Sequence, residues 1–461
     1  MGLRRIWVRL FVGVLSAVVG SWAAETAQAQ NITPNAGVVI DANGVLRMQT
    51  FADPTGALMK ERISGQKEML ANTDAAKSSK LRKVSLNRLE AAIKAQAASD
   101  RKPTDEMRFL AGLTRLQYVF FYPETGDIVV AGPAEGWVSD LSGRVVGMES
   151  GKPVLELQDL VAAMRAYAPG QNGGPVVGCS IDPTQEGLQR MQDFLRQIGG
   201  QATPNDTQFI VDGLRTNLGL QTVRVMGVNP QTHFAQVLVE ADYRMKLIGI
   251  GLEPPIVKMT TFIEKADPSV ARNALFRWYF VPDYKCVRVS DDAQAMELVG
   301  DGVKLVDEKE VVLEGGKRAI AVGEQNRASV LFTNAFTQKY AEIAARKPVY
   351  AQLRNLIDMT VAAAFIQQQD YYGKGNWSMP FLASEETFPI QTYQAPVQVD
   401  TVVASVWKAN RLLTPVAGGV TIQAKQALNV DNQLADDQGL TAKVRQENPL
   451  KELKNGQWWW D

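Results

Sequence analysis

Residues 175–228, PVVGCSIDPTQEGLQRMQDFLRQIGGQATPNDTQFIVDGLRTNLGLQTVRVMGV, decide the class of fold. A short apolar run leads into DPTQ (182–185), which supplies an N-cap, a proline at the first helical position and a capping-box glutamine. Apolar residues then recur at helical spacing as far as the glycine pair at 199–200, where this helix is expected to end. The pattern therefore predicts a strand followed by a helix.

The chain then repeats this alternation. Thr203-Pro204 is expected to begin a second helix, Thr222 to Val228 is rich in β-branched residues and predicts a strand, and the helix that follows carries His233. The order strand, helix, helix, strand, helix predicts an α/β unit whose two strands are expected to be parallel neighbours. The predicted fold class is mixed α/β and α+β and multidomain, with this central β-α-α-β-α unit flanked by smaller antiparallel sheet regions with helices.

Turn-rich boundaries divide the rest of the chain. Residues 30–56 have little periodicity, and residues 118–122 and 127–130 predict a strand pair. Further strands are expected between 277 and 313, and two helices separated at Lys347-Pro348 are expected to follow them. The predicted units are a signal peptide at 1–29, an N-terminal helical segment with a small α+β domain at 30–170, the α/β domain at 175–275, an α+β domain with a helical pair at 276–400, and an extended C-terminal segment with a mobile tail at 401–461. A helix beginning at Asp267-Pro268 is expected to end the α/β domain.

The N-terminus has the three parts of a secretory signal. Arginines at positions 4, 5 and 9 precede an apolar stretch, and AQA at 27–29 offers a cleavage site. The apolar stretch, residues 10–24, is shorter than the roughly 20 residues that a membrane-spanning helix needs. We therefore expect cleavage after Ala29, a periplasmic or extracellular location and no transmembrane span afterwards. The export route stays open.

Composition excludes several classes of function. Without residues 1–29 the chain carries 46 basic and 48 acidic residues, a balance that argues against a nucleic-acid binder. Cys179 and Cys286 are the only cysteines, and we expect both thiols to be free and largely buried. His233 is the only histidine, which nearly excludes the usual His and Cys clusters of zinc sites and haem with two histidine ligands. No metal and no cofactor are expected.

Two candidate sites involve His233. Cys179 ends a predicted strand just before a helix N-terminus, and with parallel strands it would lie near His233 as a nucleophile beside a base. The alternative is that Cys179 is a small buried hydrophobe. Glu240 and Arg244 share a helix face with His233, which indicates either a polar site facing a cleft or ion pairs on a solvated helix. We expect His233 to be structural.

Several segments together resemble a family of exported proteins from planctomycete bacteria that is known only as a domain of unknown function. The resemblance implies a location in the cell envelope and implies no activity and no catalytic residues. The segments that carry it are FYPETGD (121–127), GCSIDPT (178–184), VEADYRMKLIGIG (239–251), PVYAQLRNLID (348–358) and VWKANRLLTPVAGGV (406–420).

These observations favour a non-catalytic envelope protein that binds or scaffolds a protein or polysaccharide partner. The alternative is a hydrolase or transferase that uses carboxylates, or Cys179 with His233. Whether the protein is an enzyme stays open. A non-enzyme is favoured, because each candidate catalytic pattern is explained better by a structural role of the same residues.

Overall fold

The computed structural model describes residues 35–461 apart from 72, 172, 200–202, 267–273, 313–317, 321–325, 404–405, 409–410, 414–418, 451–452 and 455. The predicted signal peptide at 1–29 and the predicted helix start at Asp267-Pro268 lie outside the described residues. Within the described part of the chain, no helix has both the length and the apolar character needed to cross a membrane. Helices and sheets occur along the whole described chain, which confirms the mixed α/β fold class.

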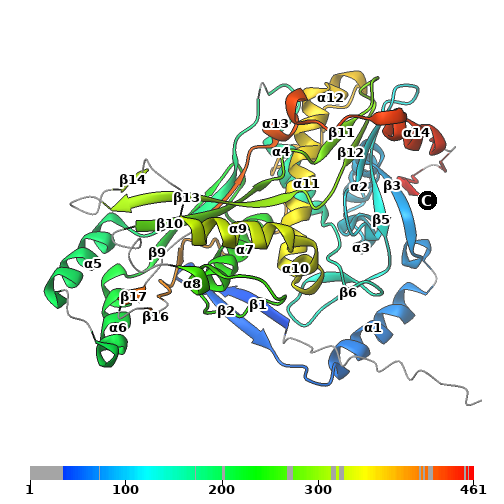
Figure 1. Ribbon diagram of the computed structural model, residues 1–461. Coiled ribbons are helices and arrows are strands. Elements are labelled where there is room, and N and C mark those ends of the chain that lie inside the picture. The colour runs from blue at the N-terminus through cyan, green and yellow to red at the C-terminus, as the bar shows by residue number, and fades with distance from the viewer. Residues whose placement is uncertain are drawn as a thin grey trace, which may run out of the picture.

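A nine-stranded mixed sheet forms one side of the molecule (Figure 1). Its strand order runs through segments that are far apart in the sequence. In that order the strands are β1 (Asn35–Ile40), β2 (Val45–Phe51), β15 (Gln398–Val399), β9 (Gln221–Met226), β8 (Val177–Asp182), β18 (Gly419–Ile422), β10 (Ala274–Pro282), β13 (Val303–Val312) and β14 (Arg318–Ile320).

A six-stranded antiparallel sheet forms the other side. Two small ribbons accompany the large sheets: β6 (Trp137–Ser139) with β7 (Val145–Gly147), and β16 (Val406–Lys408) with β17 (Arg411–Leu413). The six strands in order are β11 (Val287–Val289), β12 (Ala295–Leu298), β4 (Tyr118–Tyr122), β5 (Asp127–Ala134), β3 (Ser79–Ser85) and β19 (Trp459–Trp460).

Two long helices, α7 (His233–Gly249) and α11 (Pro348–Gln368), form the centre of the fold. Figure 1 shows α11 between the two large sheets, and α11 packs against both α4 and α7. Pro348 begins α11, so the break predicted at Lys347-Pro348 is confirmed. The other helices are α1 (Ala57–Leu70), α2 (Leu86–Ala97), α3 (Asp105–Arg108), α4 (Leu157–Ala166), α5 (Gln185–Ile198), α6 (Thr207–Leu218), α8 (Phe262–Lys265), α9 (Arg327–Gln338), α10 (Tyr340–Arg346), α12 (Tyr371–Lys374), α13 (Ala424–Ala427) and α14 (Leu440–Glu447).

The central unit has the predicted order of elements, β8, α5, α6, β9 and α7. The N-cap predicted at Asp182 is wrong, because Asp182 ends β8 and α5 begins at Gln185. Thr184 caps α5 instead, by accepting a hydrogen bond from the Gly187 N–H at 3.0 Å. The expectation of parallel strands is wrong. β8 and β9 are antiparallel neighbours, with Cys179 opposite Val225. Each of two successive helices reverses the chain, so the second strand returns in the opposite direction. The α5–α6 pair has its own small apolar core and projects from one end of the molecule (Figure 1).

Both ends of the described chain belong to the sheets. Residues 30–56, whose sequence has little periodicity, contain the hairpin of β1 and β2. The C-terminal segment contributes β18, which lies between β8 and β10, and β19, which pairs with β3. The segment is therefore not simply an extended tail. The predicted boundaries at 170, 275 and 400 remain predictions, and both large sheets combine strands from either side of them.

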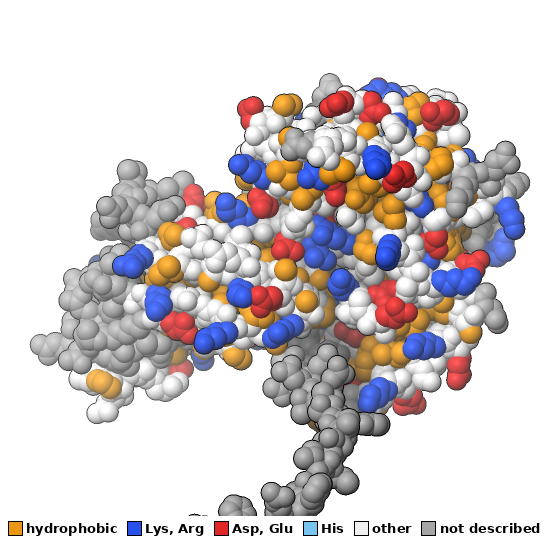
Figure 2. All heavy atoms as spheres, turned by 45° about the vertical axis from the view of Figure 1, so that its right-hand side comes forward, with side chains coloured by type: hydrophobic (Ala, Val, Ile, Leu, Met, Phe, Trp, Pro, Cys, Tyr) orange, Lys and Arg blue, Asp and Glu red, His pale blue; other side chains and the backbone are white. Residues whose placement is uncertain are grey.

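The surface carries charges of both signs. On the face drawn in Figure 2, Lys and Arg side chains are interspersed with Asp and Glu side chains and with scattered hydrophobic ones. This mixing agrees with the near-neutral composition.

A candidate site where a histidine–carboxylate cluster meets a polar cavity

A cavity of about 510 Å³ lies where the first turns of α4 and α7 approach α11 and the β6–β7 ribbon. Its lining is mostly polar, with amide side chains the commonest group. It includes the glutamines Gln66, Gln158, Gln236, Gln352 and Gln391, the aromatic residues Phe109, Trp137 and Tyr393, and the charged or titratable residues Asp105, Arg108, Arg144, Glu156, His233 and Glu240.

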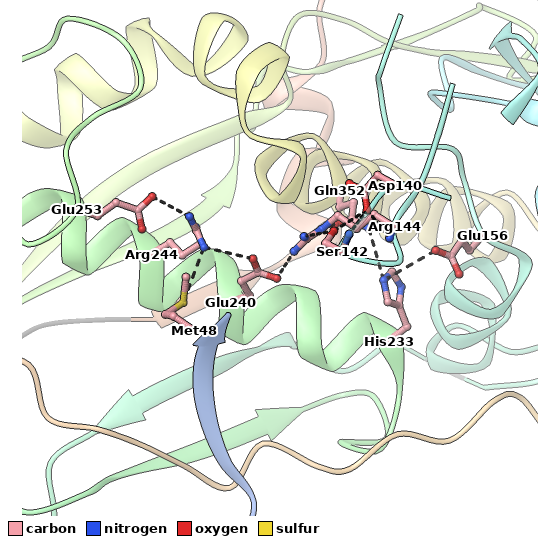
Figure 3. A network of polar contacts seen from close by, with 10 residues as sticks. All are labelled: Met48, Asp140, Ser142, Arg144, Glu156, His233, Glu240, Arg244, Glu253 and Gln352. Carbon is pink, nitrogen blue, oxygen red and sulfur yellow. Dashed lines mark hydrogen bonds and ion pairs between the residues drawn. The ribbon is translucent and has the colours of Figure 1, made fainter. Parts of the chain in front are cut away.

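His233 enters the cavity wall as the first residue of α7. Thr232 caps the helix by accepting a hydrogen bond from the Ala235 N–H at 3.2 Å, which fixes the backbone next to the imidazole. The imidazole Nδ1 lies 2.8 Å from Asp159 Oδ2. Its Nε2 lies 3.9 Å from Glu156 Oε1, a contact drawn in Figure 3. The two nitrogens therefore face two different carboxylates.

Glu156 and Asp159 come from the start of α4. Glu156 occupies the N-cap position and Asp159 the first turn, and a separation of three residues places both on the same side of the helix. The partial positive charge of a helix N-terminus favours carboxylates there. Because α4 and α7 both present their first turns here, the two carboxylates of α4 meet the imidazole of α7.

Burial and mutual charge shift the pKa values of this cluster. Burial alone would lower the pKa of His233, but the negative charges of Asp159 and Glu156 outweigh it and raise that pKa to about 9. Burial also raises the pKa of Glu156, against the opposing effect of the His233 charge. The imidazole is therefore held in its protonated form at neutral pH.

A chain of buried charges extends from this cluster along α7 (Figure 3). Arg144 donates from Nε to Gln352 Oε1 at 2.8 Å and forms an ion pair with Glu240. Arg244 lies 3.8 Å from Glu240 and donates to Glu253 Oε1 at 2.9 Å. Each charge in this chain has a partner of opposite sign, and the pair of Arg144 with Glu240 joins residues 96 positions apart.

The predicted polar face of α7 exists, but the expectation of a solvated helix is wrong. Glu240 and Arg244 are each 2% exposed, and Glu240 lines the cavity with His233 while Arg244 lies behind it. The charges are buried because α7 packs against β8 and β18 on one side and α4 and α11 on the other. Ion pairs with other segments replace the water that a surface helix would have.

Cys179 does not accompany His233. Its thiol is 1% exposed, and its pKa is raised well above the usual value by burial and then by the charge of Asp242. Asp242 comes nine residues after His233 along α7, which corresponds to about 13 Å of helix. The geometry therefore gives no support to a Cys179–His233 pair. Cys179 and Cys286 are both free and buried, as predicted.

Sequence reasoning missed Glu156 and Asp159, as well as Arg144 and Gln352. The acids at the start of α4 were the one available signal. Because acids in a first helical turn usually act as caps, this signal did not distinguish a functional site from an ordinary helix start. The contact of Asp159 with His233 spans 74 positions of sequence, and no local pattern encodes that contact.

Some polar atoms around the cavity have no hydrogen-bond partner within the described protein. They are Trp137 Nε1, Gln158 Oε1, Asp159 Oδ1 and Glu240 Oε1, one donor and three acceptors. A buried polar group without a partner loses its hydration free energy without replacement, so such atoms mark places where a bound molecule gains contacts.

Comparison with known proteins gives one match. Residues 179–262, from β8 to the start of α8, match the model of a family described as a protein of unknown function, DUF1598. No curated protein and no solved structure matches the chain. The matched segment contains Cys179, His233, Glu240 and Arg244. A domain of unknown function is thus confirmed as part of this chain, and it occupies residues 179–262.

Proposed function

We propose that this protein is exported and that it binds a hydroxyl-rich small molecule of the saccharide class in the polar cavity without converting it. The export part of the proposal rests on the basic, apolar and AQA segments of the N-terminus. N-terminal sequencing of the native protein tests it, because cleavage after Ala29 leaves Gln30 as the first residue.

The lining of the cavity carries the binding part of the proposal. An amide side chain offers both a donor and an acceptor, and the five glutamines of the lining therefore match hydroxyl groups, which also do both. Trp137 Nε1 and Gln158 Oε1 add an unpartnered donor and an unpartnered acceptor. Tyr393, which is half-buried, adds an aromatic side chain with a polar end.

The contacts of His233 support binding without catalysis. Among the described residues, its imidazole makes polar contacts with the side chains of Asp159, Glu156 and Gln352 and with no Ser, Thr or Cys side chain. A nucleophile and base pair needs a hydroxyl or thiol within hydrogen-bond reach of the imidazole. The buried Cys179 does not fill this role.

One observation favours the alternative of a hydrolase. Asp159 fixes one nitrogen of an imidazole whose ring borders a cavity, an arrangement that hydrolases use to orient a general acid or base. Product formation from a bound saccharide distinguishes this alternative from simple binding.

Isothermal titration with glucose, galactose, N-acetylglucosamine and cellobiose tests the proposal on the chain that begins at Gln30. We expect at least one saccharide to bind with 1:1 stoichiometry and to be recovered unchanged. Gln236→Ala removes a half-buried amide of the lining and is expected to weaken binding about tenfold, the effect of one lost hydrogen bond.

Gln208→Ala is the matched control, because Gln208 lies on α6 and bonds only to Asp212 of the same helix. It is expected to leave the affinity unchanged. The proposal fails if none of the four saccharides binds, or if Gln236→Ala and Gln208→Ala bind equally well.

A further inference from the structure

We propose that Glu156, Asp159 and His233 form a binding site for one divalent transition-metal ion, Zn²⁺ or Mn²⁺, in the wall of the cavity. The proposal does not depend on the saccharide ligand, because it concerns the protein side chains and the ion alone.

The geometry of the three side chains carries the first step. One ligand atom from each of Glu156, Asp159 and His233 lies within 4.8 Å of the other two. Ligand atoms around a zinc ion with bonds of about 2.1 Å lie about 3.4 Å apart in a tetrahedral arrangement. Binding therefore requires the side chains to rotate until the three ligand atoms lie about 3.4 Å apart.

A second observation points independently to a ligand. Asp159 is 4% exposed, and its Oδ2 contacts the imidazole while its Oδ1 has no hydrogen-bond partner among the described atoms. A buried carboxylate oxygen normally has a partner. An ion between Asp159 and Glu156 would supply the missing partner and would balance two carboxylates that face a single imidazole.

The chemistry of the three ligands selects the kind of ion. Without an ion the imidazole is protonated at neutral pH, so the ion displaces one ring proton into solvent when it binds. One imidazole nitrogen with two carboxylate oxygens then suits Zn²⁺ or Mn²⁺, whereas Ca²⁺ and Mg²⁺ prefer oxygen alone. Three protein ligands leave coordination positions free, and Glu156 and His233 both line the cavity, so those positions face it. A chain with one histidine cannot form a metal site from several imidazoles, but it can form a site that uses one imidazole with carboxylates.

Gln352 lies beside the imidazole, with its Nε2 3.5 Å from His233 Nε2. Arg144 fixes the position of the Gln352 amide by donating to its oxygen at 2.8 Å.

The experiment uses the chain that begins at Gln30, without a polyhistidine tag and freed of metal by a chelator. Because the protein has one histidine, its ¹⁵N-labelled imidazole gives a single set of ring signals that needs no assignment. We expect ZnCl₂ to shift these signals to saturation at one ion per chain, MnCl₂ to broaden them, and CaCl₂ to leave them unchanged. Ring signals that stay unchanged at saturating zinc overturn the proposal.

Calorimetric titration with zinc then identifies the carboxylate ligands. Glu156→Gln and Asp159→Asn are each expected to weaken zinc binding at least tenfold, whereas Asp105→Asn, a carboxylate of the same cavity outside the cluster, leaves it unchanged. Equal zinc affinity in Glu156→Gln and Asp105→Asn also overturns the proposal. If Asp159→Asn does not fold, the zinc affinity of Glu156→Gln and the imidazole signals of the unaltered protein test the proposal. Saccharide titration in the presence of chelator tests saccharide binding separately from metal binding.

Discussion

Asp242 on α7 is fully buried, and its environment decides how it ionises. The Gly419 N–H donates to its Oδ1 at 2.6 Å, and Lys246 Nζ lies 3.4 Å from its Oδ2. Burial raises the pKa of Asp242 from 3.8 to about 6, although the Lys246 charge and the Gly419 hydrogen bond act in the opposite direction. The carboxylate is therefore tolerated in the core at a free-energy cost.

This raised pKa predicts how stability depends on pH. The folded protein holds the Asp242 proton more tightly than the unfolded chain, so the contribution of Asp242 is most favourable below pH 3.8 and declines as the pH rises to about 6. Asp242→Asn cannot ionise. The free energy of unfolding of wild type minus that of Asp242→Asn is therefore expected to fall by about 2 kcal/mol between pH 4 and pH 6.

Urea denaturation at half-unit pH steps measures this difference. Asp212→Asn, at an exposed position on α6, is the matched control and is expected to give a difference that stays flat over the same range. A flat profile for Asp242→Asn as well would show that burial does not perturb this carboxylate.

The same residues show where sequence reasoning stops. The spacing of Glu240 with Arg244 indicated an ion pair along one helix, and that contact exists, at 3.8 Å. Asp242 and Lys246 have the same spacing and lie 3.4 Å apart. That spacing is the same on a solvated helix and on a buried one. Whether such a helix is buried depends on partners such as Arg144 and Glu253, which only the assembled fold brings close.

At the scale of single elements, β18 joins the late part of the chain to the central unit. It pairs antiparallel with β8 and parallel with β10. Val420 and Ile422 of β18 are both fully buried. Gly178 lies in β8 at the contact, where a Cβ atom would come within 2.2 Å of the Val420 carbonyl oxygen. Glycine at this position lets the two strands approach.

Gly178→Ala is therefore expected to lower the free energy of unfolding by about 1–3 kcal/mol or more, because the obstructing atom belongs to the backbone and cannot rotate away. Gly65→Ala in α1 is the control. A Cβ at Gly65 meets no atom within 4 Å, and alanine favours a helix over glycine by up to about 1 kcal/mol. Guanidinium denaturation midpoints compare the two variants, and an unchanged midpoint for Gly178→Ala would contradict this account of the β8–β18 contact.

Elements were predictable from sequence where the signal is local, and their partners were not. The start of α11 at Pro348 and the strand at Tyr118–Tyr122 both follow from residues within a few positions. The antiparallel pairing of β8 with β9 and the insertion of β18 depend on contacts across the chain. Glu156 and Asp159 escaped notice for the same reason, since their meeting with His233 depends on how α4 packs against α7.

At the scale of the whole molecule, the two large sheets share one core. A continuous cluster of buried residues includes Val119 and Val130 of the six-stranded sheet, Cys179 and Val420 of the nine-stranded sheet, and Leu356 of α11 between them. The α5–α6 pair contributes to a separate small core. The C-terminal segment reaches both sheets through β18 and β19, and Trp458 and Trp460 beside and within β19 are 5% and 4% exposed.

This arrangement predicts opposite outcomes for two deletions. Removing residues 401–461 takes away β18 and β19, exposes the edges of β8 and β10, and is expected to abolish cooperative unfolding although residues 30–400 contain three predicted domains. Replacing residues 183–221 by Asn-Gly removes α5 and α6 but leaves Asp182 opposite Thr222, the geometry that a two-residue hairpin turn joins. That variant is expected to keep one cooperative transition by circular dichroism and calorimetry. Residues 401–461 supply a strand to each large sheet, so removing them should open the core that the sheets share. A chain ending at residue 400 that still unfolds cooperatively would contradict this, and would show that the predicted boundary at 400 separates independent folding units.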